Sequence, residues 1–208
     1  LDLPGQPTKE PTFGLPAIWI APDQKEEAEM SGYTVVDATT VIITHLTEII
    51  KAHAHELLGR QEVKEMIELV REKQSAVIEE LLPDIMTVGE IQKVLQNLLR
   101  ERVPIRDLVT IFETLADHAR TTRDADTLTE YVRQALARTL CNLYATDGRL
   151  HVISLDAALE QKIFDAITVT PHGAFPVLEP QVAQRIFAKL GKLAEREVLA
   201  GRSPVVLT

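Results

Sequence analysis

The sequence contains little cysteine and few aromatic residues. Cys141 is the single cysteine among 208 residues, so the chain can form no internal disulfide, as is typical of proteins from reducing compartments. Because Cys141 lies beside Leu140, Leu143 and Tyr144, we expect a buried and unreactive thiol. Aromatic residues make up only 4% of the chain, so the core is expected to be aliphatic.

Long hydrophobic runs are also absent. No apolar run approaches the roughly 18 residues of a membrane span, and the best candidate, residues 41–50, is interrupted by polar side chains. The N-terminus has neither an initiator methionine nor the basic and apolar regions of a signal peptide. We therefore expect the chain to be part of a longer protein.

The sequence also has no excess of positive charge. The formal net charge is −9, and residues 56–90 carry nine acidic and four basic side chains. Acidic charge repels phosphate groups, so nucleic acids and anionic membranes are poor partners. Arg100, Arg102 and Arg106 cluster between two predicted helices, but residues 93–138 carry eight basic and seven acidic side chains. A helical DNA-binding regulator is therefore an alternative and not the leading hypothesis.

Apolar periodicity predicts a mainly α protein with small α/β parts. Residues 1–36 indicate an incomplete α/β unit: a polar loop over 1–12, a strand over 17–20, a short helix through residue 30 and a strand over 33–36. Asp37 is a suitable N-cap for a long helix over residues 38–58. The apolar stripe of this helix consists of Val41, Ile42, Leu46, Ile49, Ile50 and Leu57.

Residues 59–142 have the pattern of a compact helical domain with short loops. Thr87 and Glu90 have the spacing of a capping box, which predicts the start of a helix. Pro104 fits the first turn of the next helix. Asp124 or Asp126 is expected to cap a further helix that continues through Leu140.

The pattern changes again over residues 143–208. Asp147-Gly148 predicts a hairpin between residues 142–145 and 149–153. The remaining expectations, in chain order, are a helix capped by Ser154, a loop over 171–180, a helix over 180–200 and a strand over 205–207. This order is that of the first half of an α/β domain, truncated here.

No enzyme signature accompanies this fold. The sequence lacks a phosphate loop, a nucleophile elbow and an HExxH motif. On a continuous helix His53 and His55 point about 200° apart, so they cannot face one ion. We expect no catalysis, no cofactor and no metal, and a metal-dependent hydrolase using these two histidines is a distant alternative.

The segment over residues 10–20 is the most informative part of the chain. It contains the only tryptophan, Trp19, and an aromatic residue, Phe13, followed directly by glycine. Phe13 and Trp19 either fill the core of the α/β unit or form an exposed apolar anchor, and the residues alone do not decide between these. A shallow apolar groove edged by Glu10 would suit a helix of a partner.

A series of motifs, in order over residues 10–160, resembles the type III export-gate family. The motifs are Glu10-Pro-Thr-Phe-Gly-Leu-Pro-Ala-Ile-Trp-Ile20, Gly32-Tyr-Thr-Val-Val-Asp37, Thr44-His-Leu46, His53-Ala-His-Glu-Leu-Leu-Gly-Arg-Gln-Glu62, Val94-Leu-Gln-Asn-Leu-Leu99, Val103-Pro-Ile-Arg-Asp-Leu108 and Leu128-Thr-Glu-Tyr-Val-Arg133. The resemblance is closer to flagellar members than to virulence-secretion homologues, which are the main alternative.

The resemblance implies a large protein of the bacterial inner membrane whose cytoplasmic part has four subdomains and forms a ring, typically nine-fold. This part docks flagellar export chaperones with their substrates and meets other export components. Under this resemblance, residues 1–36 correspond to the end of a ferredoxin-like subdomain, 37–58 to a helix of the first subdomain, 59–142 to the central helical subdomain and 143–208 to the start of the C-terminal α/β subdomain. The membrane would be reached only through a part that precedes this chain.

The resemblance also implies a chaperone-docking site. The matching positions are Glu10, Phe13 and Thr44, with Phe13 as the apolar anchor and Thr44 on a facing helix. The family often has aspartate where this chain has Glu10, so the charge is kept and the side chain is longer. Residues 18–20 are then expected to form a core strand, with Glu10 and Phe13 at the docking site.

Overall fold

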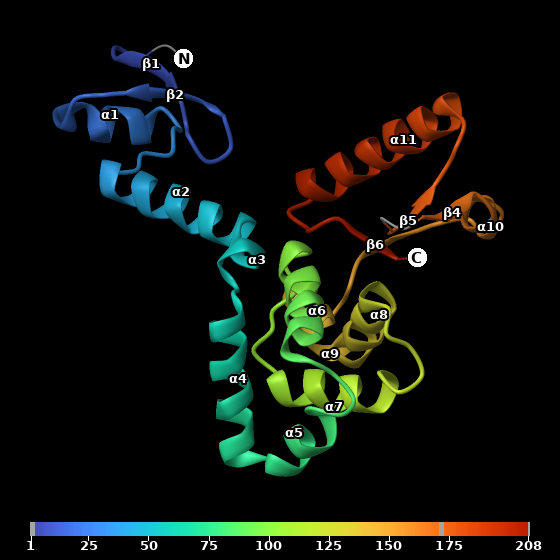
Figure 1. The fold of residues 1–208 in the computed structure, drawn as a ribbon. Helices are drawn as coiled ribbons and strands as arrows, with labels where there is room; N and C mark the ends of the chain where they lie inside the picture. The colour runs from blue at the N-terminus through green and yellow to red at the C-terminus, as the bar shows by residue number, and fades with distance from the viewer. Residues whose placement is uncertain (1–2, 171–172, 208) are drawn as a thin grey trace. The chain divides into compact units, whose positions relative to one another are not determined.

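The computed structural model describes residues 3–170 and 173–207 (Figure 1). The chain divides into two compact units, residues 1–136 and 137–208. The finer boundaries expected after residues 36, 58 and 142 remain predictions. The mainly helical composition with small strand pairs agrees with the predicted fold class.

The first unit begins with an antiparallel hairpin of β1 (Gln6–Lys9) and β2 (Pro16–Trp19), in which Gln6 pairs with Trp19. The expected loop over residues 1–12 is thus wrong over β1, and residues 1–2 lie outside the described residues. The 3-10 helix η1 (Pro22–Gln24) and α1 (Lys25–Met30) follow as expected. Residues 33–36 form no strand, because a β-branched run needs a partner strand and the structure provides none for it.

The predicted long helix is two helices. α2 (Ala38–Ala52) begins at Asp37, whose carboxylate accepts a hydrogen bond from the Thr40 N–H at 2.9 Å. The helix ends at His53, whose φ of −108° and ψ of 12° are not helical, and α3 (Ala54–Leu57) continues in a new direction. The prediction of one helix over 38–58 is therefore wrong at its last turn and a half.

Five helices form the body of this unit: α4 (Arg60–Lys73), α5 (Ser75–Leu81), α6 (Val88–Arg100), α7 (Leu108–His118) and α8 (Ala125–Ala135). The capping box of Thr87 and Glu90 opens α6 as predicted. α7 does not start at Pro104: Asp107 accepts hydrogen bonds from the Thr110 N–H and hydroxyl, which sets the helix start at Leu108, four residues later. Asp124, and not Asp126, caps α8.

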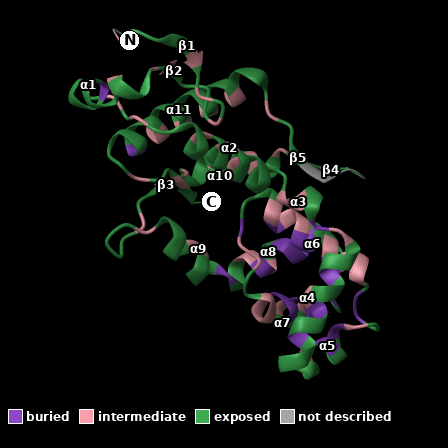
Figure 2. Ribbon diagram, turned by 90° about the vertical axis from the view of Figure 1, so that its left-hand side faces the viewer, coloured by how far each residue is buried: buried purple, intermediate pink, exposed green. Residues whose placement is uncertain are grey.

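The hydrophobic core lies among these five helices (Figure 2). Apart from Ala28, every buried apolar residue that the structure describes falls between Leu58 and Leu136. Phe112 is the one aromatic side chain among them, which confirms the aliphatic core expected from composition. In contrast, α2 buries none of its side chains, and Ile42, Leu46 and Ile50 of its apolar stripe are exposed.

Hydrogen bonds and one ion pair join the α2–α3 segment to the helical body formed by α4–α8. The Leu58 carbonyl oxygen accepts hydrogen bonds from the side-chain amides of Gln92 at 2.9 Å and Gln96 at 3.0 Å. Arg102 forms an ion pair with Glu48 of α2 at 3.2 Å. Arg102 has a φ of 60°, the left-handed conformation of the residue that follows a helix, which glycine adopts more easily. Arg102, whose side chain pairs with Glu48, therefore has an unfavourable backbone conformation.

The second unit contains α9 (Ala137–Tyr144), β3 (Val152–Ser154), α10 (Ala157–Asp165), β4 (Ile167–Thr170), β5 (Gly173–Pro176), α11 (Pro180–Leu199) and β6 (Val205–Leu207). β3 pairs with β6 in parallel, and β4 pairs with β5 in antiparallel fashion. Of the described residues in this unit, only Glu197 is buried.

Several expectations for this unit are corrected. The helix expected to run through Leu140 is interrupted at Leu136. The Asp147-Gly148 turn forms, but it closes a single bridge between Thr146 and Arg149, because the residues before it belong to α9. Asp156 caps α10 in place of Ser154. The expected loop over 171–180 contains β5, with residues 171–172 outside the described residues. Cys141 is exposed and not buried. The long helix α11 and strand β6 agree with the prediction.

Over the part of the chain that the structure describes, no helix combines the length and the apolar character needed to cross a bilayer.

The helical body should depend strongly on its core side chains. Leu95 is fully buried, so Leu95→Ala is expected to lower the free energy of unfolding of the first unit by about 2–5 kcal/mol. Leu69→Ala on α4 is the control, because Leu69 is 57% exposed and should change stability little. Urea denaturation followed by circular dichroism measures both, and equal effects would contradict the assigned core.

Candidate functional site

The loop between β1 and β2, residues 10–15, holds two of the three predicted site residues. Glu10 directly follows β1, and its main-chain N–H donates to the Leu15 carbonyl oxygen at 2.8 Å. The Gly14 N–H donates to the Glu10 carbonyl oxygen at 2.9 Å, and Gly14 has a φ of 69°. This conformation favours glycine, so Gly14 allows the chain to turn back directly after Phe13.

The Glu10 side chain lies against the same loop. Its Oε1 accepts a hydrogen bond from the Thr12 N–H at 2.8 Å, and its Oε2 accepts one from the Phe13 N–H at 2.6 Å. Partial desolvation raises the pKa of Glu10, but the polar groups of Thr12 and the Phe13 N–H lower it more, so the pKa lies below its usual value. The carboxylate is therefore held in its charged form by the loop itself.

Phe13 is an exposed aromatic residue at the tip of this ordered loop. Its side chain is 67% exposed, and that of Leu15 is also exposed. Trp19 on β2 is 50% exposed, so the expectation that residues 18–20 form a core strand is wrong for Trp19, while Ile18 and Ile20 are half-buried. A two-stranded hairpin has too little surface around it to bury both aromatic side chains.

Thr44 lies on α2, the neighbouring helix of the same unit, and is exposed. Among the described residues, no side-chain hydrogen bond joins Thr44 to Glu10 or Phe13. His45, the residue after Thr44, makes only the last and smallest of the contributions that lower the pKa of the Glu10 carboxyl. The role of Thr44 therefore stays a prediction.

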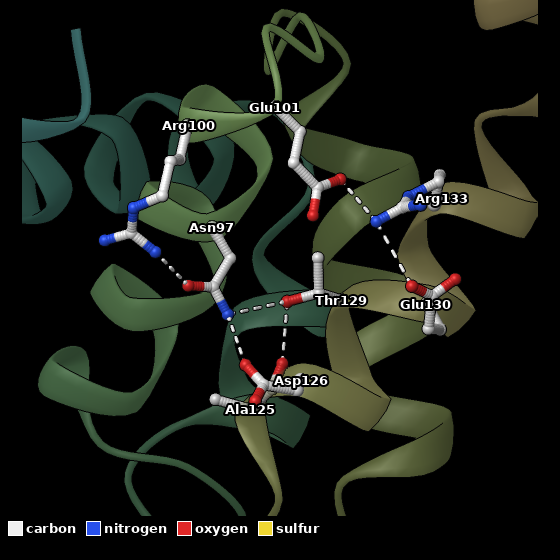
Figure 3. A network of polar contacts seen from close by, with 8 residues as sticks. All are labelled: Asn97, Arg100, Glu101, Ala125, Asp126, Thr129, Glu130 and Arg133. Carbon is white, nitrogen blue, oxygen red and sulfur yellow. Dashed lines mark hydrogen bonds and ion pairs between the residues drawn. The ribbon is translucent and has the colours of Figure 1, made fainter. Parts of the chain in front are cut away.

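A second group of polar residues, which the sequence did not indicate, joins α6 to α8 (Figure 3). The Asn97 amide donates to Asp126 Oδ1 at 3.0 Å and to Thr129 Oγ1 at 3.3 Å, and its oxygen accepts from Arg100 at 3.0 Å. Thr129 is buried and donates to the Ala125 carbonyl oxygen at 2.6 Å.

Arg133 lies beside this group and forms ion pairs with Glu101 and Glu130. The residues surround a small cavity of about 160 Å³. Because the carboxylates, the amide and the hydroxyl bind one another, the cluster is a structural tie between two helices. Arg100 and Arg102, which had suggested DNA binding, are bound to Asn97 and Glu48 respectively.

A larger cavity of about 410 Å³ lies in the second unit, beside the Thr146–Arg149 turn and lined also by His151 and Arg202. Arg202 is already paired with Glu197 at 2.7 Å, and this pair lowers the pKa of the Glu197 carboxyl. Polar side chains therefore line the cavity, and the positive charge of one of them, Arg202, is already balanced by Glu197.

The two histidines of the hydrolase alternative both lie near one carboxylate oxygen, that of Glu56. The helix break at His53 brings Glu56 Oε1 to 2.8 Å from His53 Nδ1 and 3.7 Å from His55 Nε2. The His53 hydrogen bond lowers the pKa of Glu56. Over residues 3–170 and 173–207, however, no group of three or more histidine, cysteine or carboxylate side chains is arranged to hold a metal ion.

The chain matches a protein-family model over its entire length, residues 1–208, and the family is described as the FHIPEP family. The chain belongs to the FHIPEP family. This FHIPEP chain is 47% identical to the flagellar biosynthesis protein FlhA of Bacillus subtilis and 43% identical to that of Escherichia coli strain K12. The matches cover 98% and 99% of the chain, which spans about 30% of the length of these relatives.

Solved structures of export-gate proteins have the same fold as this FHIPEP chain. The Chlamydia pneumoniae CdsV protein matches with a TM-score of 0.77 and 30% identity, covering 93% of this chain and 56% of that one. CdsV in a complex with CdsO matches with a TM-score of 0.72 and 28% identity, over 92% and 56% of the two chains. Nonameric EPEC SctV-C matches with a TM-score of 0.71 and 29% identity, over 82% and 53%. The resemblance to the C-terminal cytoplasmic region of type III export-gate proteins is confirmed.

The β1–β2 hairpin should not tolerate a side chain at Gly5. A Cβ atom at Gly5 would lie 2.3 Å from the Trp19 carbonyl oxygen and 2.5 Å from Ile18 Cγ2. Gly5→Ala is therefore expected to separate the strands and to abolish the slow amide exchange of β1, as measured by hydrogen exchange with NMR detection. Gly191→Ala on α11 is the control, since beyond its chain neighbours and the nearby backbone of its own helix no atom lies within 4 Å of the position that its methyl group would take, and the helix should be kept.

The Asn97 cluster should stabilise the contact between α6 and α8. Asn97→Asp replaces the amide donor by a carboxylate that faces Asp126, so we expect a loss of about 1–3 kcal/mol in the free energy of unfolding. The effect should decrease at pH values that protonate the two carboxylates. Asn142→Asp at the exposed surface of α9 makes the same chemical change and should leave stability nearly unaltered, as measured by urea denaturation.

Proposed function

We propose that this chain is a docking part of a flagellar type III export gate, and that it binds export chaperones with their substrates at the loop of residues 10–15 and the adjoining face of α2. The observation that carries the proposal is Phe13, a large aromatic side chain that is 67% exposed on a loop fixed by internal hydrogen bonds. The FHIPEP family and the FlhA relatives support an export role for the longer protein.

The energetics favour a binding role for this residue. Aromatic residues are the commonest energetic centres of protein interfaces, because they bury a large area with few rotatable bonds. On α2, Ile42, Ile43 and Leu46 are also exposed, so this helix offers further apolar surface in the same unit. An apolar surface of this kind fits an amphipathic helix of a partner, which presents apolar side chains at i, i+3, i+4 and i+7.

Self-association is the second part of the proposal. EPEC SctV-C is nonameric, and the EscV cytosolic domain from a type III secretion system is also described as nonameric. We propose that the longer protein containing this chain forms a ring of the same kind. The complex of CdsV with CdsO supports contacts with other export components as well.

The flagellar assignment has better support than the virulence-secretion alternative. The flagellar FlhA relatives are 40–47% identical to this chain, whereas the solved secretion-system domains are 27–30% identical. We propose that the chain lies at the cytoplasmic face of the inner membrane, connected to it by parts of the longer protein. We also propose that it acts by binding, without catalysis. The DNA-binding alternative has less support, because two of its three arginines, Arg100 and Arg102, are bound to Asn97 and Glu48.

Removing the aromatic anchor tests the docking proposal. Phe13→Ala should reduce the affinity for flagellar export chaperones at least tenfold by isothermal titration calorimetry, because a buried aromatic contact at an interface centre is lost. Thr44→Ala should cause a smaller loss. Phe164→Ala is the matched control: Phe164 is 70% exposed in the second unit, and its removal should not change the affinity.

The circular dichroism spectrum must be the same for the three variants and the wild type. Equal affinity of Phe13→Ala and wild-type protein for every chaperone that binds the chain would refute the docking site. Equal losses for Phe13→Ala and Phe164→Ala would mean that exposed aromatic residues bind without specificity.

A further inference from the structure

We propose that Glu10 is a positioning residue, whose carboxylate fixes the loop that presents Phe13 and leaves the contact with the partner to apolar side chains. This inference rests on the proposed docking function and changes the role of one of its residues. Glu10 was expected to contribute its charge directly to the docking site. In the structure, the carboxylate instead accepts hydrogen bonds from main-chain N–H groups of its own loop.

The first support is that both oxygens of the carboxylate are used within the loop. Oε1 accepts from the Thr12 N–H and Oε2 from the Phe13 N–H, at 2.8 and 2.6 Å. The main chain of Glu10 closes the loop at the same time, through its contacts with Gly14 and Leu15. Four hydrogen bonds therefore converge on one residue in a six-residue loop, and two of them need the carboxylate.

The second support is that this arrangement repeats a device found elsewhere in the chain. Asp37, Asp107 and Asp124 each accept a hydrogen bond from the N–H three residues later, with N···O distances of 2.9, 3.2 and 2.8 Å. Glu10 makes the same contact with Phe13, three residues later. At the three aspartates the contact defines where a helix begins. At Glu10 it defines where an exposed aromatic side chain is held.

The order of this loop affects the free energy with which Phe13 binds a partner. A flexible loop would lose conformational entropy when its aromatic residue enters a partner, and this loss would weaken binding. A carboxylate that orders the loop beforehand removes part of that cost. The loop then contributes affinity through the apolar contact of Phe13, and the docking at this point should depend little on salt.

Amide NMR tests the positioning role without any partner. In the wild-type chain, the Thr12 and Phe13 N–H resonances should shift together during an acid titration, with a midpoint below the usual pKa of glutamate. Because the pKa is lowered in the folded loop, the loop is ordered above that midpoint and loses order as the pH falls through it. His45 on α2 is one of the groups that lower the pKa of Glu10, so the measurement is repeated in His45→Gln, where the two shifts should persist.

Three substitutions of Glu10 complete this measurement. Glu10→Gln and Glu10→Ala should abolish both amide shifts and accelerate exchange of the Phe13 N–H, whereas Glu10→Asp should restore them, as the three aspartate caps indicate. Glu26→Gln on the exposed surface of α1 removes the same charge and should change neither amide. If the two amides do not respond to Glu10→Gln, the positioning role is wrong.

Chaperone affinity then separates positioning from direct contact. Under positioning, Glu10→Gln should weaken binding about tenfold at both low and high salt, and Glu10→Asp should restore it. A loss that occurs only at low salt would show direct pairing with a cation of the partner and would overturn the inference. If wild-type protein binds no chaperone, the docking proposal fails, while the amide measurement still decides whether Glu10 orders the loop.

Discussion

The hydrogen bond from a main-chain N–H to a nearby carboxylate determines much of this structure. Asp37, Asp107 and Asp124 start three helices in this way, and Glu90 closes the capping box of a fourth. The same contact lowers the pKa of Asp37, through the Thr40 N–H, and that of Glu90, through the Thr87 N–H. At Glu10 it organises a loop instead of a helix. Hydrogen bonds to an ionised carboxylate are charge-assisted and are among the stronger ones available to an exposed backbone.

Their local nature explains which elements could be predicted from sequence. A cap and the helix it starts lie within a few residues, so the starts of α2 and α6 could be placed from patterns alone. The start of α11 has no side-chain cap and is marked by Pro180 at its first position instead. Where two caps compete, as Pro104 does with Asp107 and Ser154 with Asp156, the outcome depends on packing that the sequence does not show. Strands were harder to predict than helices. β1 and β5 acquire their conformation only by pairing with a partner strand. The β-branched run after Gly32 has no partner strand and forms none itself.

The candidate site was predictable in part for the same reason. Glu10 and Phe13 are three residues apart, and the motif that contains them placed both in the site. Their separate roles required coordinates, because a carboxylate that binds the backbone and one that faces a partner have the same sequence. The cluster around Asn97 could not be predicted, since it joins side chains 29 and 32 residues apart, and no local signal marks such a contact.

The division between core and site also has a physical basis. The buried side chains of the first unit are concentrated in α4–α8, whereas the loop that holds Phe13 is stabilised by polar contacts within six residues. Because those contacts lie outside the core, we expect their loss to free the loop while the helical body stays folded. Glu48 and Arg102, with the Leu58 carbonyl clamped by two glutamines, connect α2 to that body. Polar contacts, together with the packing of α3 against α6 and the burial of Leu58, thus attach the segment that carries the proposed docking surface to the helical body.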